Sequence, residues 1–157
     1  STAEPRGLVG HDGRMRPPLA ELLDLEAHPE GGWFRRTWTS PTPAALAGGR
    51  VRAAASAILF HLPVGEASAW HRVRADELWI AQVGRVTLEL GGDGPAPASD
   101  VTVSVLGVDV ASGDAPQVLV PAGTWQRTRP GDADALVTCV VSPEFHFDDF
   151  ELHPDVT

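Results

Sequence analysis

The chain has 157 residues, of which 43% are hydrophobic, and this is enough for one domain with its own core and no disulfide framework. Its formal net charge of -9 argues against a nucleic-acid-binding protein, because phosphate contacts need clustered cations. All 12 basic residues are arginine, so no lysine is available for a Schiff-base mechanism.

The apolar runs and the single cysteine indicate the cellular location and the role of the thiol. No run approaches the length of a membrane span, and the N-terminus lacks the apolar core of a signal peptide, so we expect a cytoplasmic protein without a membrane anchor. Cys139 stands in an apolar run, Ala135 to Val141, which favours a buried, inert thiol.

Taken in order, the chain begins with residues 1–16, which combine charges and glycines without periodicity and are typical of a flexible arm. Residues 17–157 are expected to form a single domain. Pro17 and Pro18 favour a short helix from Leu19 to about Leu25. A turn at 28–32 then leads into a strand at 33–39, rich in aromatic and β-branched residues.

Within that turn, His28 and Glu30 have two readings, a turn-building role and a functional one, and turn building is the commoner use of such positions. Arg36 in the following strand either binds an anionic substrate or lies on a solvated face. Residues 40–49 are typical of a surface loop, since they contain two prolines and a Gly-Gly pair.

The next predicted strand, 52–62, has Ser56, Ile58 and Phe60 on one face and His61 on the other. The pattern leaves open which face is internal. His61 precedes a proline at the strand's end and is expected at the rim.

The stretch from Gly65 to Gly84 carries the chemistry. Alternation along a short strand places His71 on a face of small apolar residues. After a turn at 75–76, Glu77 and Trp79 share one face of the following strand. His71 and Glu77 are therefore expected to point into one pocket that Trp79 lines, while Trp70, next to His71 in sequence, faces the opposite way.

Further strands are predicted downstream, separated by glycine- and proline-rich turns, at 85–90, 101–106, 117–120, 125–129 and 135–142. Roughly ten short strands with turns at intervals of about ten residues indicate an all-β jelly roll.

Two motifs in this order resemble those of the cupin superfamily. The first is the frame Gly65, His71, Glu77, Gly84, and the second runs from Gly113 through V-P-A-G-T-W to Gln126. Three further sequence motifs resemble those of a small single-domain branch of cupins, whose members mostly lack an assigned reaction. These motifs are W-H-R-V-R-A-D-E-L-W, H-P-E-G-G-W-F-R and P-E-F-H-F-D-D-F. The resemblance implies a cupin jelly-roll β-barrel with a short N-terminal helix, and a homodimer.

In the superfamily, the positions of His71, Val73, Glu77 and Gln126 usually ligate a divalent metal. Val73 cannot ligate, and the Gln126 amide is a weaker donor than imidazole. A Zn, Mn, Fe or Ni ion on His71, Glu77 and Gln126 with added water is one expectation. The other is a metal-free set, in which Glu77 raises the basicity of His71 for proton transfer. A tyrosine acid, as in cupin-like epimerases, is absent because the chain has 0 tyrosines.

The function expected from these features is acid/base catalysis by His71 and Glu77 on a small polar, carbonyl-containing or sugar-like metabolite, as in an isomerase, epimerase or lyase. The residues expected to contact the substrate are Gln126, Trp79, Ser56, Phe60 and Arg36. Two alternatives stay open, a non-catalytic small-ligand-binding cupin and a metal-dependent oxygenase. No nucleic acid or membrane is expected as a partner.

Overall fold

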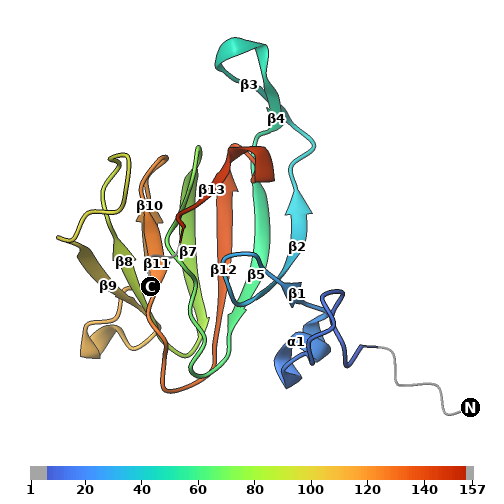
Figure 1. Cartoon of the computed structure of the whole chain (residues 1–157), viewed down its shortest axis with the longest axis vertical. Helices are drawn as coiled ribbons and strands as arrows, with labels where there is room; N and C mark the ends of the chain where they lie inside the picture. The colour runs from blue at the N-terminus through green and yellow to red at the C-terminus, as the bar shows by residue number, and fades with distance from the viewer. Residues whose placement is uncertain (1–6, 155–157) are drawn as a thin grey trace, which may run out of the picture.

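The computed structural model describes residues 7–154 as two antiparallel β-sheets packed face to face (Figure 1). The larger sheet has the order β1-β2-β5-β12-β7-β10 and the smaller sheet the order β13-β6-β11-β8-β9. The strands are β1 (Glu26–Ala27), β2 (Trp33–Thr39), β3 (Pro43–Ala45), β4 (Val51–Ala53), β5 (Ser56–Leu62), β6 (His71–Val73), β7 (Asp76–Val83), β8 (Val86–Leu90), β9 (Thr102–Leu106), β10 (Gln117–Val120), β11 (Gln126–Thr128), β12 (Ala135–Ser142) and β13 (Phe150–Leu152). The predicted all-β jelly roll with one short helix is confirmed.

The core lies between the two sheets and is built by alternation along their strands. β12 is the central strand of the larger sheet, paired with β5 on one side and β7 on the other. The buried hydrophobic residues there include Phe60, Trp79, Leu88 and Val137. Ile58 packs against the same cluster, so the face of β5 that carries Ser56, Ile58 and Phe60 is the internal one, which the sequence pattern leaves open.

A single helix, α1 (Pro18–Leu23), packs outside the larger sheet (Figure 1). Its Ala20 forms a small second core with Leu25 and Trp33. The helix ends earlier than the predicted Leu25, because Asp24 adopts a left-handed conformation with φ 56 and its N–H bonds back into the helix. Residues 7–16 carry a Val9–Met15 bridge, and Arg16 contacts Asp24 and Glu26; residues 1–6 of the expected flexible arm lie outside the described range.

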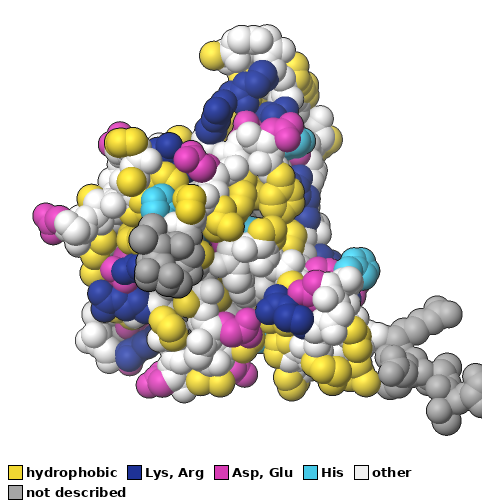
Figure 2. Space-filling model, viewed as in Figure 1, with side chains coloured by type: hydrophobic (Ala, Val, Ile, Leu, Met, Phe, Trp, Pro, Cys, Tyr) yellow, Lys and Arg dark blue, Asp and Glu magenta, His cyan; other side chains and the backbone are white. Residues whose placement is uncertain are grey.

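The predicted loop at 40–49 instead carries β3, which pairs with β4 in a hairpin that projects from the barrel (Figure 1). The single strand predicted at 52–62 is divided accordingly into β4 and β5. The division falls at residues 54–55, whose backbone groups bond Thr42 and Ser40 at the base of the hairpin. Dark blue side chains gather at this hairpin in Figure 2, where Arg50 and Arg52 lie.

Three single-turn 3-10 helices complete the described part of the chain, Ala47–Gly49, Val110–Ser112 and Phe147–Asp149. Within residues 7–154, no helix is both long and apolar enough to cross a membrane.

Candidate active site

His71, Glu77 and Gln126 come together in the barrel interior, as the sequence predicts. His71 begins β6 and Gln126 begins β11, and the two are partners in the register of the smaller sheet. Glu77 lies near the start of β7, in the larger sheet. All three side chains are buried, with exposed fractions of 2%, 7% and 0% for His71, Glu77 and Gln126.

Gln126 links Glu77 to Trp79. Its Nε2 donates a hydrogen bond of 2.7 Å to Glu77 Oε1, and its Oε1 accepts one of 2.9 Å from Trp79 Nε1. These two bonds fix the orientation of the amide, because a tryptophan N–H can only donate. The amide oxygen therefore accepts from Trp79, and the amide N–H group donates to the Glu77 carboxylate.

The nearest ionic partner of His71 is Glu30, from the turn before β2. Glu30 Oε2 lies 2.6 Å from His71 Nε2 as an ion pair, and this buried oxygen makes no aligned hydrogen bond. The backbone locks this turn against the loop before β6, since Ala69 N–H donates to the Glu30 carbonyl at 2.7 Å. Gly31 adopts φ +109 there, and a Cβ at this position would overlap the carbonyl oxygen of Ala67. Only glycine fits at this close approach.

Both ring nitrogens of His71 face oxygen acceptors. Nδ1 lies 2.7 Å from the carbonyl oxygen of Ala69, while Nε2 faces the Glu30 carboxylate. A carbonyl oxygen cannot donate, so a ring that satisfies both contacts carries a proton on each nitrogen. Burial lowers the pKa of His71, but the Glu30 charge, its hydrogen bond and the Glu77 charge outweigh burial and raise the pKa to about 8. At neutral pH His71 is therefore an imidazolium.

The two carboxylates differ in proton affinity. Burial raises the pKa of Glu30, but the charge of His71 and its hydrogen bond hold that pKa below its ordinary value. Burial and the neighbouring Glu30 charge raise the pKa of Glu77 above its ordinary value, against the opposing effect of His71. The result is an ionised Glu30 that holds the imidazolium, and a Glu77 of greater basicity that lines the same cavity from the larger sheet.

His28 completes the polar group as a neutral ring. Its Nδ1 accepts a hydrogen bond of 3.2 Å from the backbone N–H of Glu30. Burial lowers the pKa of His28, which agrees with an unprotonated Nδ1. His28 thus both builds the turn, as its position in the sequence favours, and lies beside the acid/base group.

A cavity of about 20 Å³ adjoins these side chains, enough for about one water molecule. Besides the polar residues, its lining contains Phe34, Ser56, Ile58, Val73, Cys139, Val141 and Phe145. Cys139 is fully buried, and burial raises the pKa of its thiol well above the ordinary value, in agreement with the predicted inert thiol.

An aromatic segment covers the cavity. Phe145, Phe147 and Phe150 contact one another and the His28 ring, and the Phe150 ring lies 5.7 Å from the His71 ring. Arginines from β2, from β4 and from the residue before β4 contact this segment. Arg36 donates to Glu144 and to the Phe145 carbonyl, and Arg50 and Arg52 both pair with Asp149.

The remaining predicted contact residues occupy different places. Ser56 lines the cavity, and its hydroxyl accepts a hydrogen bond from the N–H of Phe145. Phe60 packs edge-on against Trp79, within the core. Arg36 lies outside the cavity, where it holds the covering segment. His61, expected at the rim, is buried, and its Nδ1 contacts the Ala135 carbonyl at 2.7 Å.

Glu30 completes the candidate site and lies outside the pair expected from the sequence. Its signal is the H-P-E-G-G turn, in which two consecutive glycines allow the chain to approach the loop before β6. The local sequence does not show which segment the turn approaches, because Glu30 and His71 lie 41 positions apart in the chain.

As they lie, the three predicted ligands do not fit a metal centre. The Gln126 oxygen is bonded to Trp79, and both nitrogens of His71 face other acceptors. Among residues 7–154 no group of three or more histidine, cysteine or carboxylate side chains is arranged to hold an ion. Metal binding by His71, Glu77 and Gln126 stays a prediction, and the chemistry proposed below uses no metal.

The comparisons with known proteins agree with this fold. The model of the family described as Cupin superfamily (DUF985) matches residues 18–153. A protein from Shewanella oneidensis is 38% identical, with 88% of this chain and 85% of that chain covered and a TM-score of 0.74. A hypothetical protein from Leishmania major is 28% identical over 85% and 84% of the two chains, with a TM-score of 0.77.

A more distant structure, a Cupin 2 conserved barrel domain protein from Salinispora arenicola, is 20% identical over 82% and 87% of the two chains and shares the fold with a TM-score of 0.52. No curated protein matches the chain. The family match and the 38% identity lead to one conclusion: the chain belongs to the DUF985 family of the cupin superfamily.

Proposed function

We propose that the protein is a small-molecule enzyme that moves protons on a polar, carbonyl-containing or sugar-like metabolite, as an isomerase, epimerase or lyase. The observation that carries this proposal is a buried imidazolium, His71, between two carboxylates of different basicity. Pairs of titratable groups whose environments push their pKa values apart are the usual basis of acid/base catalysis.

In this proposal Glu77 is the base and His71 the acid. Glu77 takes a proton from the carbon next to a substrate carbonyl. The carbonyl oxygen shares the Nε2–H of His71 with the Glu30 carboxylate and takes that proton, giving an enol. Return of a proton to another carbon or to the other face gives isomerisation or epimerisation, and loss of a leaving group from the neighbouring carbon gives a lyase reaction. A pKa of about 8 suits an acid that must be protonated at neutral pH.

Glu30 acts in this scheme as a positioning residue. Its ionised carboxylate stabilises the imidazolium at the same Nε2 that the substrate oxygen must reach, while the Ala69 carbonyl holds the other ring nitrogen. The hydrogen bond from Gln126 holds the Glu77 carboxylate in one orientation, so the base is fixed before the substrate arrives.

Substrate entry requires the aromatic cover to move, because the present cavity has room for only about one water molecule. The ion pairs of Asp149 with Arg50 and Arg52 hold that cover at the barrel mouth, and the Arg50 side chain is 38% exposed. Arg52 and Asp149 are only 16% and 11% exposed, so opening of this segment must also return a largely buried ion pair to water.

Solvent deuterium incorporation tests the proposal even while the natural substrate is unidentified. Small aldehydes, ketones and sugar acids are incubated with the protein in D₂O, and exchange at the carbon next to the carbonyl is followed by NMR. The expected result is exchange in at least one compound, slowed by about 100-fold or more in Glu77→Gln and in His71→Asn. Glu21→Gln, at an exposed carboxylate on α1 that lies outside the cavity lining and its cover, is the matched control and should retain exchange.

The alternative of a non-catalytic binder gives a different result in the same screen. A compound that binds with saturable chemical-shift changes but shows no exchange, in the wild type and the variants alike, would support a binding protein. The oxygenase alternative would require turnover that depends on added Fe(II) and oxygen; the present donor set, with Val73 and a bonded Gln126, does not favour it.

A further inference from the structure

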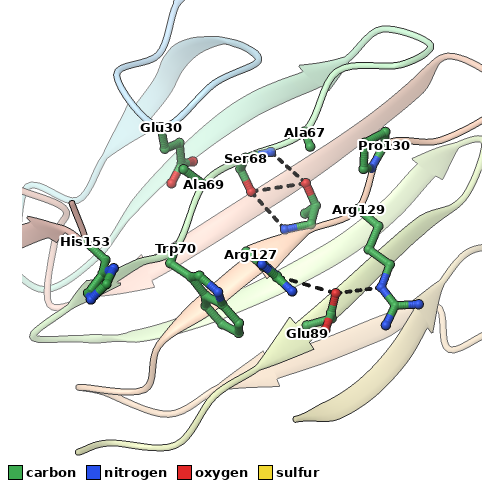
Figure 3. Close-up of a pocket in the computed structure, with 11 residues that line it drawn as sticks. Glu30, Ala67, Ser68, Ala69, Trp70, Glu89, Arg127, Arg129, Pro130 and His153 are labelled. Carbon is green, nitrogen blue, oxygen red and sulfur yellow. Dashed lines mark hydrogen bonds and ion pairs between the residues drawn. The ribbon is translucent and has the colours of Figure 1, made fainter. Parts of the chain in front are cut away.

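A second concave site lies on the outer face of the smaller sheet. Gln126 and Thr128 of β11 are buried, so the alternating residues Arg127 and Arg129 point outward. They line a groove of about 640 Å³ together with Trp70, Glu89 and His153 (Figure 3). This volume is within the range of about 300–1,000 Å³ that small-molecule sites occupy.

Two guanidinium groups in this groove share one carboxylate. Glu89 is 1% exposed, and its Oε1 lies 2.6 Å from Arg129 Nε and 3.5 Å from Arg127 Nε (Figure 3). The hydrogen bond from Arg129 lowers the pKa of Glu89, so the carboxylate is ionised. Both contacts use the Nε atoms, and the terminal nitrogens of Arg127 and Arg129 make no hydrogen bond to the residues that the structure describes.

The orientation of Arg127 is fixed by stacking. Its guanidinium carbon lies 4.6 Å from the centre of the Trp70 ring. The Trp70 ring packs closely against Gly91, where an added Cβ would stand only 3.0 Å from the ring. A stacked guanidinium is confined to a plane, and its terminal edge is preorganised for a planar or tetrahedral anion.

The local charge is opposite to that of the whole protein. Glu30 also lines the groove, but the His71 imidazolium matches its charge, so Arg127 and Arg129 against Glu89 leave one positive charge in excess, in a chain of net charge -9. Guanidinium groups bind carboxylate and phosphate oxygens through paired N–H groups, and a carboxylate that anchors their Nε atoms leaves those pairs available.

We propose that this groove is a binding site for a small molecule that carries a phosphate or carboxylate group, held by the terminal N–H groups of Arg127 and Arg129. Neither arginine contacts His71 or Glu77, but the groove adjoins the acid/base group, because Glu30 lines both the groove and the interior cavity. It stands whether or not the protein is an enzyme.

Isothermal titration with three probes, inorganic phosphate, phenyl phosphate and benzoate, tests the site. We expect saturable binding of at least one probe, weakened by at least about tenfold in Arg127→Gln and in Arg129→Gln. Preference for phosphate over benzoate, or the reverse, identifies the anionic group. Each variant leaves Glu89 one arginine partner, and thermal unfolding checks that each is folded.

Arg14→Gln is the matched control, because Arg14 also lies over a tryptophan, 4.8 Å from the Trp33 ring, but outside the groove. Its affinity for the probes should equal that of the wild type. Equal losses in Arg14→Gln and the groove variants would mean general charge attraction and overturn the proposal. Absence of binding by all three probes also overturns the proposal. So does a groove that is closed by a second copy of the chain. Sedimentation would reveal that case as a dimer that dissociates in Arg127→Gln and stays intact in phosphate.

Discussion

Replacement of Glu30 by glutamine should remove a pH-dependent part of the protein's stability. The pKa of His71 rises from 6.5 to about 8 on folding, and this rise corresponds to about 2 kcal/mol of folding free energy. Because the folded pKa is the higher one, this contribution is fully present below about pH 6.5 and is lost as the pH rises through about 8.

In Glu30→Gln the opposite charge closest to His71 is gone, and burial then favours the neutral ring. The variant should therefore be at least about 2 kcal/mol less stable than the wild type near pH 6, with a difference that shrinks towards pH 9. Urea unfolding followed by tryptophan fluorescence, at several pH values between about 6 and 9, measures this difference.

Glu144→Gln is the control for this experiment. It also loses an ion pair, with Arg36, but arginine does not titrate in this range. Its stability profile between about pH 6 and 9 should run parallel to that of the wild type. A wild-type stability that does not fall between these pH values, or a fall that persists in Glu30→Gln, would refute the assignment of the charge to His71.

Three further predictions concern the scaffold of the site. Gly31→Ala should lower the free energy of unfolding in urea by about 1–3 kcal/mol more than Gly13→Ala does. Both glycines have positive φ, but of the two only Gly31 would place a Cβ against another backbone segment. Equal losses of stability would contradict the close approach. Trp79→Phe should lower the free energy of unfolding by about 1–3 kcal/mol, because the buried Gln126 oxygen loses its hydrogen-bond donor. Trp38→Phe should change it little, since Trp38 is 48% exposed. Elemental analysis of protein purified without chelator should find well under one metal ion per chain; a stoichiometric ion that disappears in Glu77→Gln would show that these side chains are ligands after all.

The sequence was sufficient for the fold because its signals are local. Alternation along Ala135–Ser142 and the glycine-framed motifs around His71 and Gln126 predict short strands with polar residues on their inner faces, and the structure has these strands. The hairpin of β3 and β4 was missed, since proline and glycine in residues 40–49 are equally typical of a loop.

The candidate site was only half predictable, for a physical reason. His71 and Glu77 share a pocket because alternation along their own strands aims them there, whatever the distant contacts are. Glu30 reaches His71 only through the docking of one turn onto another loop, where Gly31 removes the Cβ that would collide. Likewise, the hydrogen bond from Trp79 that engages the Gln126 oxygen depends on packing across the two sheets.

The charge state of His71 can be measured most directly by NMR of selectively labelled histidine. Ring nitrogen and carbon shifts, followed against pH in the wild type and assigned with His71→Asn, report its protonation. We predict both ring nitrogens protonated near pH 7 and a pKa of about 8. A neutral ring at that pH, with a pKa below the ordinary value of 6.5, would contradict the imidazolium and with it the proposed acid.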